Sequence, residues 1–172
     1  MQLRAVVLFV ALPLVLSACE KPKSAEEQAR DDARAIAMVE AAQHVAPPPV
    51  PLDPQPITAA DIEQNKLYGV GCTLVPADQP GGNPLVVATD KRAVIKLGSR
   101  FVTFAADAGS PPLALGARTH YVGKAQSLLL EKASGDGTRL GEESFRWDGT
   151  LTLRDAHEQL VFTSSGAIVC GG

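Results

Sequence analysis

Basic residues are too few in this chain to form a strongly cationic surface. The sequence has 16 lysine and arginine residues against 19 aspartate and glutamate residues, a formal net charge of −3. Proteins that bind nucleic acids need clustered basic charge to neutralise phosphates, so this composition argues against a nucleic-acid partner. For the same reason we expect no polybasic support for attachment to a membrane.

A long apolar run is also missing. The run at residues 5–16 is shorter than the roughly 20 residues that span a bilayer as a helix, and it contains Pro13. Arg4 precedes this run and small residues follow it, which is typical of the signal peptide of an exported protein. A transmembrane helix is the alternative. We assign residues 1–18 to the signal peptide and exclude them from the fold.

The sequence lacks the usual motifs of catalysis and metal binding. Its three histidines, His44, His120 and His157, lie far apart, whereas a zinc site needs three or four converging ligands. No serine stands in a nucleophile elbow, and Gly81-Gly82 has the context of a turn, not of a phosphate-binding loop. We therefore expect no metal, no cofactor and no enzymatic activity. A Ser-His-Asp triad assembled from distant positions stays open, because geometry defines it.

Cysteine is scarce as well, and the first of the three has a special position. Cys19 ends the sequence Leu-Ser-Ala-Cys directly after the apolar run. This motif resembles the lipobox of bacterial lipoprotein precursors. The resemblance implies that the Cys19 thiol carries diacylglycerol, that residues 1–18 are removed and that acyl chains hold the protein to a membrane. Because Glu20 follows, and not aspartate, it also implies the outer membrane, facing the periplasm, with the inner membrane as the less favoured location.

The two remaining cysteines, Cys72 and Cys170, are expected to form a disulfide bond. Both lie in apolar runs of period two, and an exported protein meets an oxidising compartment, where an even number of cysteines usually pairs. Closing a loop of nearly a hundred residues would stabilise the fold by about 4–5 kcal/mol in the chain-entropy model. Two buried free thiols are the alternative.

Two segments separate the expected anchor from the expected domain. Residues 19–45 form the lipidated N-terminus and a spacer helix, in which Ser24 and Glu27 match a capping box. Residues 46–56 contain six prolines and form a linker of polyproline II type. A weak coiled coil for the helix and a ligand for a proline-binding domain for the linker are the alternatives.

Residues 57–172 are expected to fold as a mainly β domain. After a short helix at 59–68, short apolar runs alternate with turn residues as far as residue 170. The strongest hairpin signal is Asp148-Gly149, and residues 164–166 are read as another turn. About eight strands without a long helix between them favour a small antiparallel barrel or sandwich. In a barrel, the disulfide would join the first strand to the last.

A candidate binding surface follows an irregular loop at residues 105–116. Arg118, His120 and Lys124 supply basic character there, and Tyr121 supplies an amphipathic ring. Tyrosine and arginine are frequent in binding hot spots, and long loops on a rigid scaffold often carry binding residues. The alternative is that these are ordinary residues of an alternating strand.

Gly116-Ala117, followed by Tyr121, is similar to the Ser-Gly-x-x-Tyr motif of membrane-bound inhibitors of c-type lysozyme. That family consists of small Gram-negative lipoproteins with an eight-stranded antiparallel barrel. Leu115 stands where the family has its inhibitory serine, Tyr121 is two positions further along, and the family's second motif has no match. We therefore expect a non-catalytic binding or structural module of the cell envelope, with an unidentified protein partner. Inhibition of a periplasmic cell-wall hydrolase is the alternative.

Overall fold

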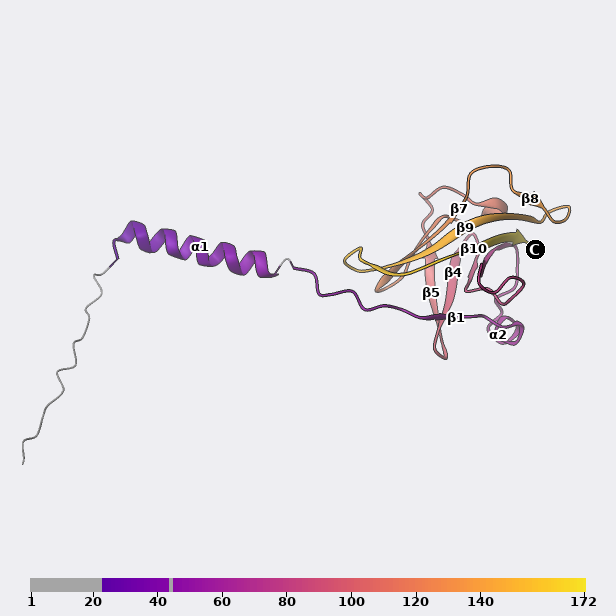
Figure 1. The fold of residues 1–172 in the computed structure, drawn as a ribbon, viewed down its shortest axis with the longest axis horizontal. Coiled ribbons are helices and arrows are strands. Elements are labelled where there is room, and N and C mark those ends of the chain that lie inside the picture. Colours follow the sequence, from indigo (N-terminus) through magenta and orange to yellow (C-terminus); the bar gives the residue numbers. More distant parts are fainter. Residues whose placement is uncertain (1–22, 44) are drawn as a thin grey trace, which may run out of the picture. The chain divides into compact units, whose positions relative to one another are not determined.

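The computed structural model describes residues 23–43 and 45–172 (Figure 1). The chain divides into two compact units between residues 46 and 47. Helix α1 (Ala25–Gln43) belongs to the first unit and has no buried side chain. It begins with the predicted capping box, in which Glu27 N–H donates to Ser24 Oγ and Ser24 N–H donates to the Glu27 carboxylate. No helix in the described ranges is long and apolar enough to cross a membrane.

The predictions for the signal peptide, Cys19 and His44 lie outside the described residues. The lipid anchor therefore stays a prediction from the lipobox.

Eight antiparallel strands of the second unit close into a barrel (Figure 1). Each strand pairs with the next in the order β2-β3-β4-β5-β6-β7-β9-β10, and β10 pairs with β2. The strands are β2 (Gly71–Pro76), β3 (Val86–Ala88), β4 (Arg92–Leu97), β5 (Arg100–Ala106), β6 (His120–Val122), β7 (Gln126–Lys132), β9 (Phe145–Asp155) and β10 (Leu160–Gly171). The predicted antiparallel β fold is confirmed, and of its two forms the barrel is the correct one.

The disulfide closes the barrel where its first strand meets its last. Cys72 of β2 and Cys170 of β10 are directly opposite in the register, with their Cα atoms 4.0 Å apart, and they are bonded to each other. Both side chains are buried. The predicted pairing and its position at the closing seam are confirmed.

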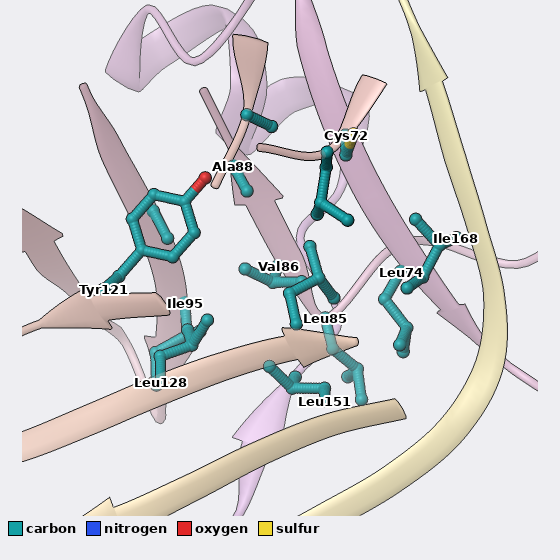
Figure 2. Close-up of a cluster of buried hydrophobic side chains, with 14 of the residues drawn as sticks. Cys72, Leu74, Leu85, Val86, Ala88, Ile95, Tyr121, Leu128, Leu151 and Ile168 are labelled. Carbon is teal, nitrogen blue, oxygen red and sulfur yellow. The ribbon is translucent and has the colours of Figure 1, made fainter. Parts of the chain in front are cut away.

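Apolar side chains fill the barrel interior. Because side chains alternate between the two faces of a strand, every second residue of the long strands points inward. Figure 2 shows part of this core, where side chains from different strands point toward one another. The largest fully buried residues of the core cluster are Leu74, Val86, Ile95, Phe104, Tyr121, Leu128, Leu130, Leu151, Leu153 and Ile168.

Two predicted turns are wrong, because both positions lie inside long strands. β9 continues through Asp148-Gly149, and β10 continues through residues 164–166. Figure 1 shows both strands as long and curved. Gly149 and Gly166 face each other in the register, and a Cβ atom on either would collide with the carbonyl oxygen of Glu131 or Val75, respectively. These glycines allow the backbones to approach closely at a bend of the barrel.

The end of the proline-rich segment belongs to the barrel. Strand β1 (Pro54–Gln55) pairs with Lys96 and Leu97 at the end of β4. Leu52 N–H donates to the Val161 carbonyl, 2.9 Å away, and its side chain packs against the core. The second unit thus begins at Pro47, earlier than the predicted start at residue 57. Backbone pairing explains the difference, because proline blocks only its own N–H and leaves its carbonyl free to bond.

Helix α2 (Ala59–Asn65) packs outside the barrel on β3 and β4. Ile57, Leu67 and Val94 are buried in this second, smaller apolar cluster. Thr58 and Asp61 form the capping box, and Asp61 also accepts a hydrogen bond from Lys96 Nζ of β4 at 2.8 Å. The helix is shorter than predicted, because Lys66 adopts a left-handed conformation (φ 51°) directly after it.

Candidate binding site

The structure corrects the predicted binding surface at Tyr121, which is fully buried. Its hydroxyl donates to the Thr89 carbonyl at 2.8 Å and accepts from Arg118 N–H at 2.7 Å. In Figure 2 the ring lies among the labelled core residues, with Ile95 and Leu128 beside it. Burial raises the pKa of Tyr121, which keeps the hydroxyl protonated as a donor. Tyr121 is a residue of the core that ties two loops together.

Of the other predicted surface residues, Arg118 and His120 both contact Ser110, one at its carbonyl and the other at its hydroxyl. Arg118 is half-buried and donates from Nη1 to the Ser110 carbonyl at 3.1 Å. His120 is also half-buried, at the beginning of β6, whereas Lys124 is exposed in the turn after β6. This surface was predicted because polar residues cluster in the sequence here. Such clustering does not show which side chains point into the barrel.

His120 and Asp107 form a pair, with Nδ1 and Oδ2 3.0 Å apart. The hydrogen bond with His120, and to a lesser degree the one from Gly109 N–H, holds the pKa of Asp107 below its usual value. A Ser-His-Asp triad would need a hydroxyl at the other ring nitrogen of His120. Within residues 45–172 no hydroxyl is hydrogen-bonded there, and the nearby Ser110 Oγ bonds to backbone groups of Asp107 and His120.

A more promising site is a hollow of about 680 Å³ between three loops. We call it the Tyr68 hollow. The residues that line it come from the segment after α2, from the β3–β4 turn and from the 3₁₀ turn η1 (Ala114–Gly116). They are Tyr68, Gly69, Val70, Thr89, Asp90, Lys91, Arg92, Leu115 and Gly116. Loops held on a rigid barrel are a common place for binding residues.

The buried Tyr121 holds two of these walls in place. Its hydroxyl bonds to Thr89 in the β3–β4 turn and to Arg118, two residues after η1. The two loops approach closely, since a Cβ on Gly116 would lie 3.5 Å from the Cβ of Asp90. These contacts fix the position of the two walls relative to each other.

The third wall presents apolar side chains to solvent. Leu67 is buried and donates its N–H to the Ile62 carbonyl at 2.9 Å, which anchors the segment. The residues that follow project outward, so that Tyr68 is 66% and Val70 56% exposed. Both side chains line the same hollow, where a partner could cover them.

One residue of the wall has a strained backbone. In the described part of the chain, three residues other than glycine have a positive φ, and one of them, Leu115 (φ 56°), lines this hollow. A leucine in the left-handed region is unfavourable by roughly 1–2 kcal/mol. Such residues are frequent at functional sites, and here the packing around η1 keeps Leu115 in this conformation in the wall of the hollow.

The charged residues of the hollow are two cations and one anion. Lys91 and Arg92 lie in its wall together with Asp90, and Arg92 Nη2 is 3.4 Å from the Lys66 carbonyl oxygen. Among the described residues, no group of three metal-ligating side chains converges here or elsewhere. The arrangement suits non-covalent binding of a partner that offers both apolar and acidic groups. This site was not predicted from the sequence, although Tyr68-Gly69-Val70 after a capped helix was a signal of it.

Comparison of the chain with protein-family models, with curated protein sequences and with solved structures found no match.

Proposed function

We propose that the protein is a lipoprotein of the outer membrane, anchored through Cys19 and facing the periplasm, whose barrel is a non-catalytic binding module of the cell envelope. The observation that carries the proposal is the Tyr68 hollow, in which the exposed side chains of Tyr68 and Val70 lie in one wall and two cations in another.

The filled interior of the barrel supports binding on its outside. Small barrels either hold a ligand inside or fill the space with side chains, and here leucine, isoleucine, valine and aromatic residues fill it. Leu52 covers the core at one end, and Leu113 and Ala117, on either side of η1, are buried at the other. A partner would therefore bind to loops on the outer surface.

The hollow fits a protein partner better than a small molecule. It is wide and open, and its exposed tyrosine and its arginine are the residue types that most often supply binding energy between proteins. Lys91 and Arg92 favour acidic side chains in the partner, while Tyr68 and Val70 favour apolar ones. The expected partner is an envelope protein that presents both.

Capture from detergent-solubilised envelopes tests the binding role. Full-length protein should capture a defined envelope protein, identified by mass spectrometry, and Tyr68→Ala should reduce the captured amount at least tenfold. Leu160→Ala is the matched control, because Leu160 is 51% exposed and lies at the other end of β10 from Cys170. Equal losses in both variants, or none in either, would count against the Tyr68 hollow.

Labelled palmitate tests the anchor separately. The wild type should incorporate the label and Cys19→Ala should not, and equal incorporation would contradict lipidation at this residue.

Inhibition of a periplasmic cell-wall hydrolase is the second candidate. The eight-stranded barrel favours it, because that is the fold implied by the resemblance at Gly116-Ala117 and Tyr121. Leu115, at the position of the family's inhibitory serine, lines the Tyr68 hollow. If the purified protein inhibits c-type lysozyme and Leu115→Asp abolishes the inhibition, hydrolase inhibition would replace the binding module as the proposed function.

A further inference from the structure

Strand β5 extends beyond its neighbour on one side of the barrel. On the β4 side, all residues from Arg100 to Ala105 have partners. On the β6 side, within residues 45–172, only Ala105 and Ala106 are paired, with Val122 and Tyr121. β6 ends there, and Gly123 N–H closes the following turn by donating to the Gln126 carbonyl at 2.8 Å. The first five of the seven residues of β5, residues 100–104, are left as an unpaired edge on this side.

The hydrogen bonds around this strand show which backbone groups face the unpaired side. Ala106 N–H donates toward β4, to Lys91, and Asp107 N–H donates toward β6, to His120. Successive residues of a strand direct their backbone groups to opposite sides, so the odd-numbered residues face β6. The N–H and C=O groups of Phe101 and Thr103 therefore point along the barrel wall into the space beside β5 that β6 does not reach, where an edge strand presents a template for another strand.

The chain itself fills the corresponding gap on the neighbouring strand. β3 pairs with β4 only as far as Ile95, and β1 adds to Lys96 and Leu97 beyond that point. A short extended segment can thus extend the sheet at this end of the barrel. On β5 no described segment does the same.

We propose that the unpaired edge of β5 is a second binding site, at which an extended, acidic segment of a partner protein adds as a strand. Backbone groups of Phe101 and Thr103 would supply the main hydrogen bonds, as in other cases of strand addition. This site is independent of the Tyr68 hollow.

The charge of the edge favours an acidic segment of another protein over a second copy of β5. Arg100 is exposed at the start of the edge, and Lys124 is exposed in the turn at its other end, where a Cβ on Gly123 would lie 2.9 Å from the Phe104 ring. Antiparallel pairing of two copies of β5 would place Arg100 of each copy near Lys124 of the other. Like charges that meet at a pairing edge are unfavourable. An acidic segment from another protein meets complementary charge along the same edge.

Selection from a library of random ten-residue peptides on the full-length protein tests this proposal. The selected peptides should be rich in aspartate, glutamate and β-branched residues, and should slow hydrogen exchange in residues 100–106. Thr103→Pro removes an N–H that the fold does not use and should weaken their binding at least tenfold. Thr103→Val, which keeps that N–H, is the matched control and should bind as the wild type does.

Lys124→Glu is a second variant that tests the proposal even if Thr103→Pro does not fold. It changes only an exposed turn residue. It should weaken binding of the acidic peptides at least tenfold at low salt. Peptides that bind Thr103→Pro or Lys124→Glu as well as the wild type, or a selection without acidic peptides, would overturn the proposal. A wild-type dimer that Thr103→Pro dissociates would overturn it too, since the occupant would then be a second copy.

Discussion

Tyr121 shows at the residue scale how a side chain that looks suited to binding can serve the core instead. In the sequence it stands between basic residues after an irregular loop, and an amphipathic ring in that place suggests a contact surface. In the structure its ring is buried and its hydroxyl satisfies a carbonyl and an N–H of two different loops. Alternation in β6 could have placed it inside, but a three-residue strand is too short for the pattern to be evident.

Tyr121→Phe should therefore destabilise the protein. The change leaves Arg118 N–H and the Thr89 carbonyl without their partner, and an unsatisfied buried group costs about 1–3 kcal/mol. Urea unfolding followed by the fluorescence of Trp147, the single tryptophan, measures the change. Tyr68→Phe is the control, because its hydroxyl is on an exposed side chain, and it should stay within about 0.5 kcal/mol of the wild type. Equal stability of the two variants would show that the buried hydroxyl does not join the loops.

At the scale of elements, the strands with glycine are the least predictable part of the fold. Aspartate-glycine between alternating apolar runs is a strong hairpin signal, because glycine permits positive φ. Gly149 and Gly166 do not have positive φ and are needed for the close approach of neighbouring strands. Local sequence cannot distinguish these two reasons for glycine, since the second depends on the curvature of the closed barrel. By contrast, β4 and β5 were predictable, because their residues alternate regularly and Gly98, with a positive φ, forms the turn between them.

Gly149→Ala tests this reading of the β9–β10 bend. The added methyl group would collide with the Glu131 carbonyl and with the Ile168 side chain in the core. Overpacking of this kind destabilises by about 1–3 kcal/mol, which denaturant unfolding can measure. Gly109→Ala is the control, since a Cβ there meets only Asp107 Oδ1 at 3.4 Å. If Gly149→Ala were no more destabilising than Gly109→Ala, the close approach would be refuted.

The attachment of α2 to β4 should depend on pH through Asp61. The hydrogen bond from Lys96, followed by those from Thr58, lowers the pKa of Asp61 from 3.8 to about 2. The unfolded chain thus binds more protons than the folded one between these values, and stability rises with pH across this range. The contribution of Asp61 is complete above pH 4 and is lost as the pH falls toward 2.

In Asp61→Ala, the fall in stability between pH 5 and pH 2 should be smaller than in the wild type. Thermal unfolding at several pH values measures it, with Asp78→Ala, an exposed loop residue, as the control. An unchanged pH profile in Asp61→Ala would contradict the role of this carboxylate.

At the scale of the whole molecule, the sequence predicted the class of fold and the disulfide better than the site. The alternation of apolar residues and the even number of cysteines after Cys19 are properties of composition and period, so they can be read along the chain. The Tyr68 hollow combines residues 68–70, 89–92 and 115–116, which only barrel closure brings together. The docking of residues 52–55 was hidden for a similar reason, because a proline-rich segment gives no strand pattern of its own.

Photocrosslinking in cells tests the central claim most directly, that a tethered barrel binds an envelope protein through the Tyr68 hollow. A photoreactive phenylalanine analogue in place of Tyr68 should yield one defined adduct with an envelope protein, and the same analogue in place of Leu160 should not yield it. The adduct should also weaken when Cys19→Ala releases the chain from the membrane. No adduct at position 68, or the same adduct at both positions, would contradict the account.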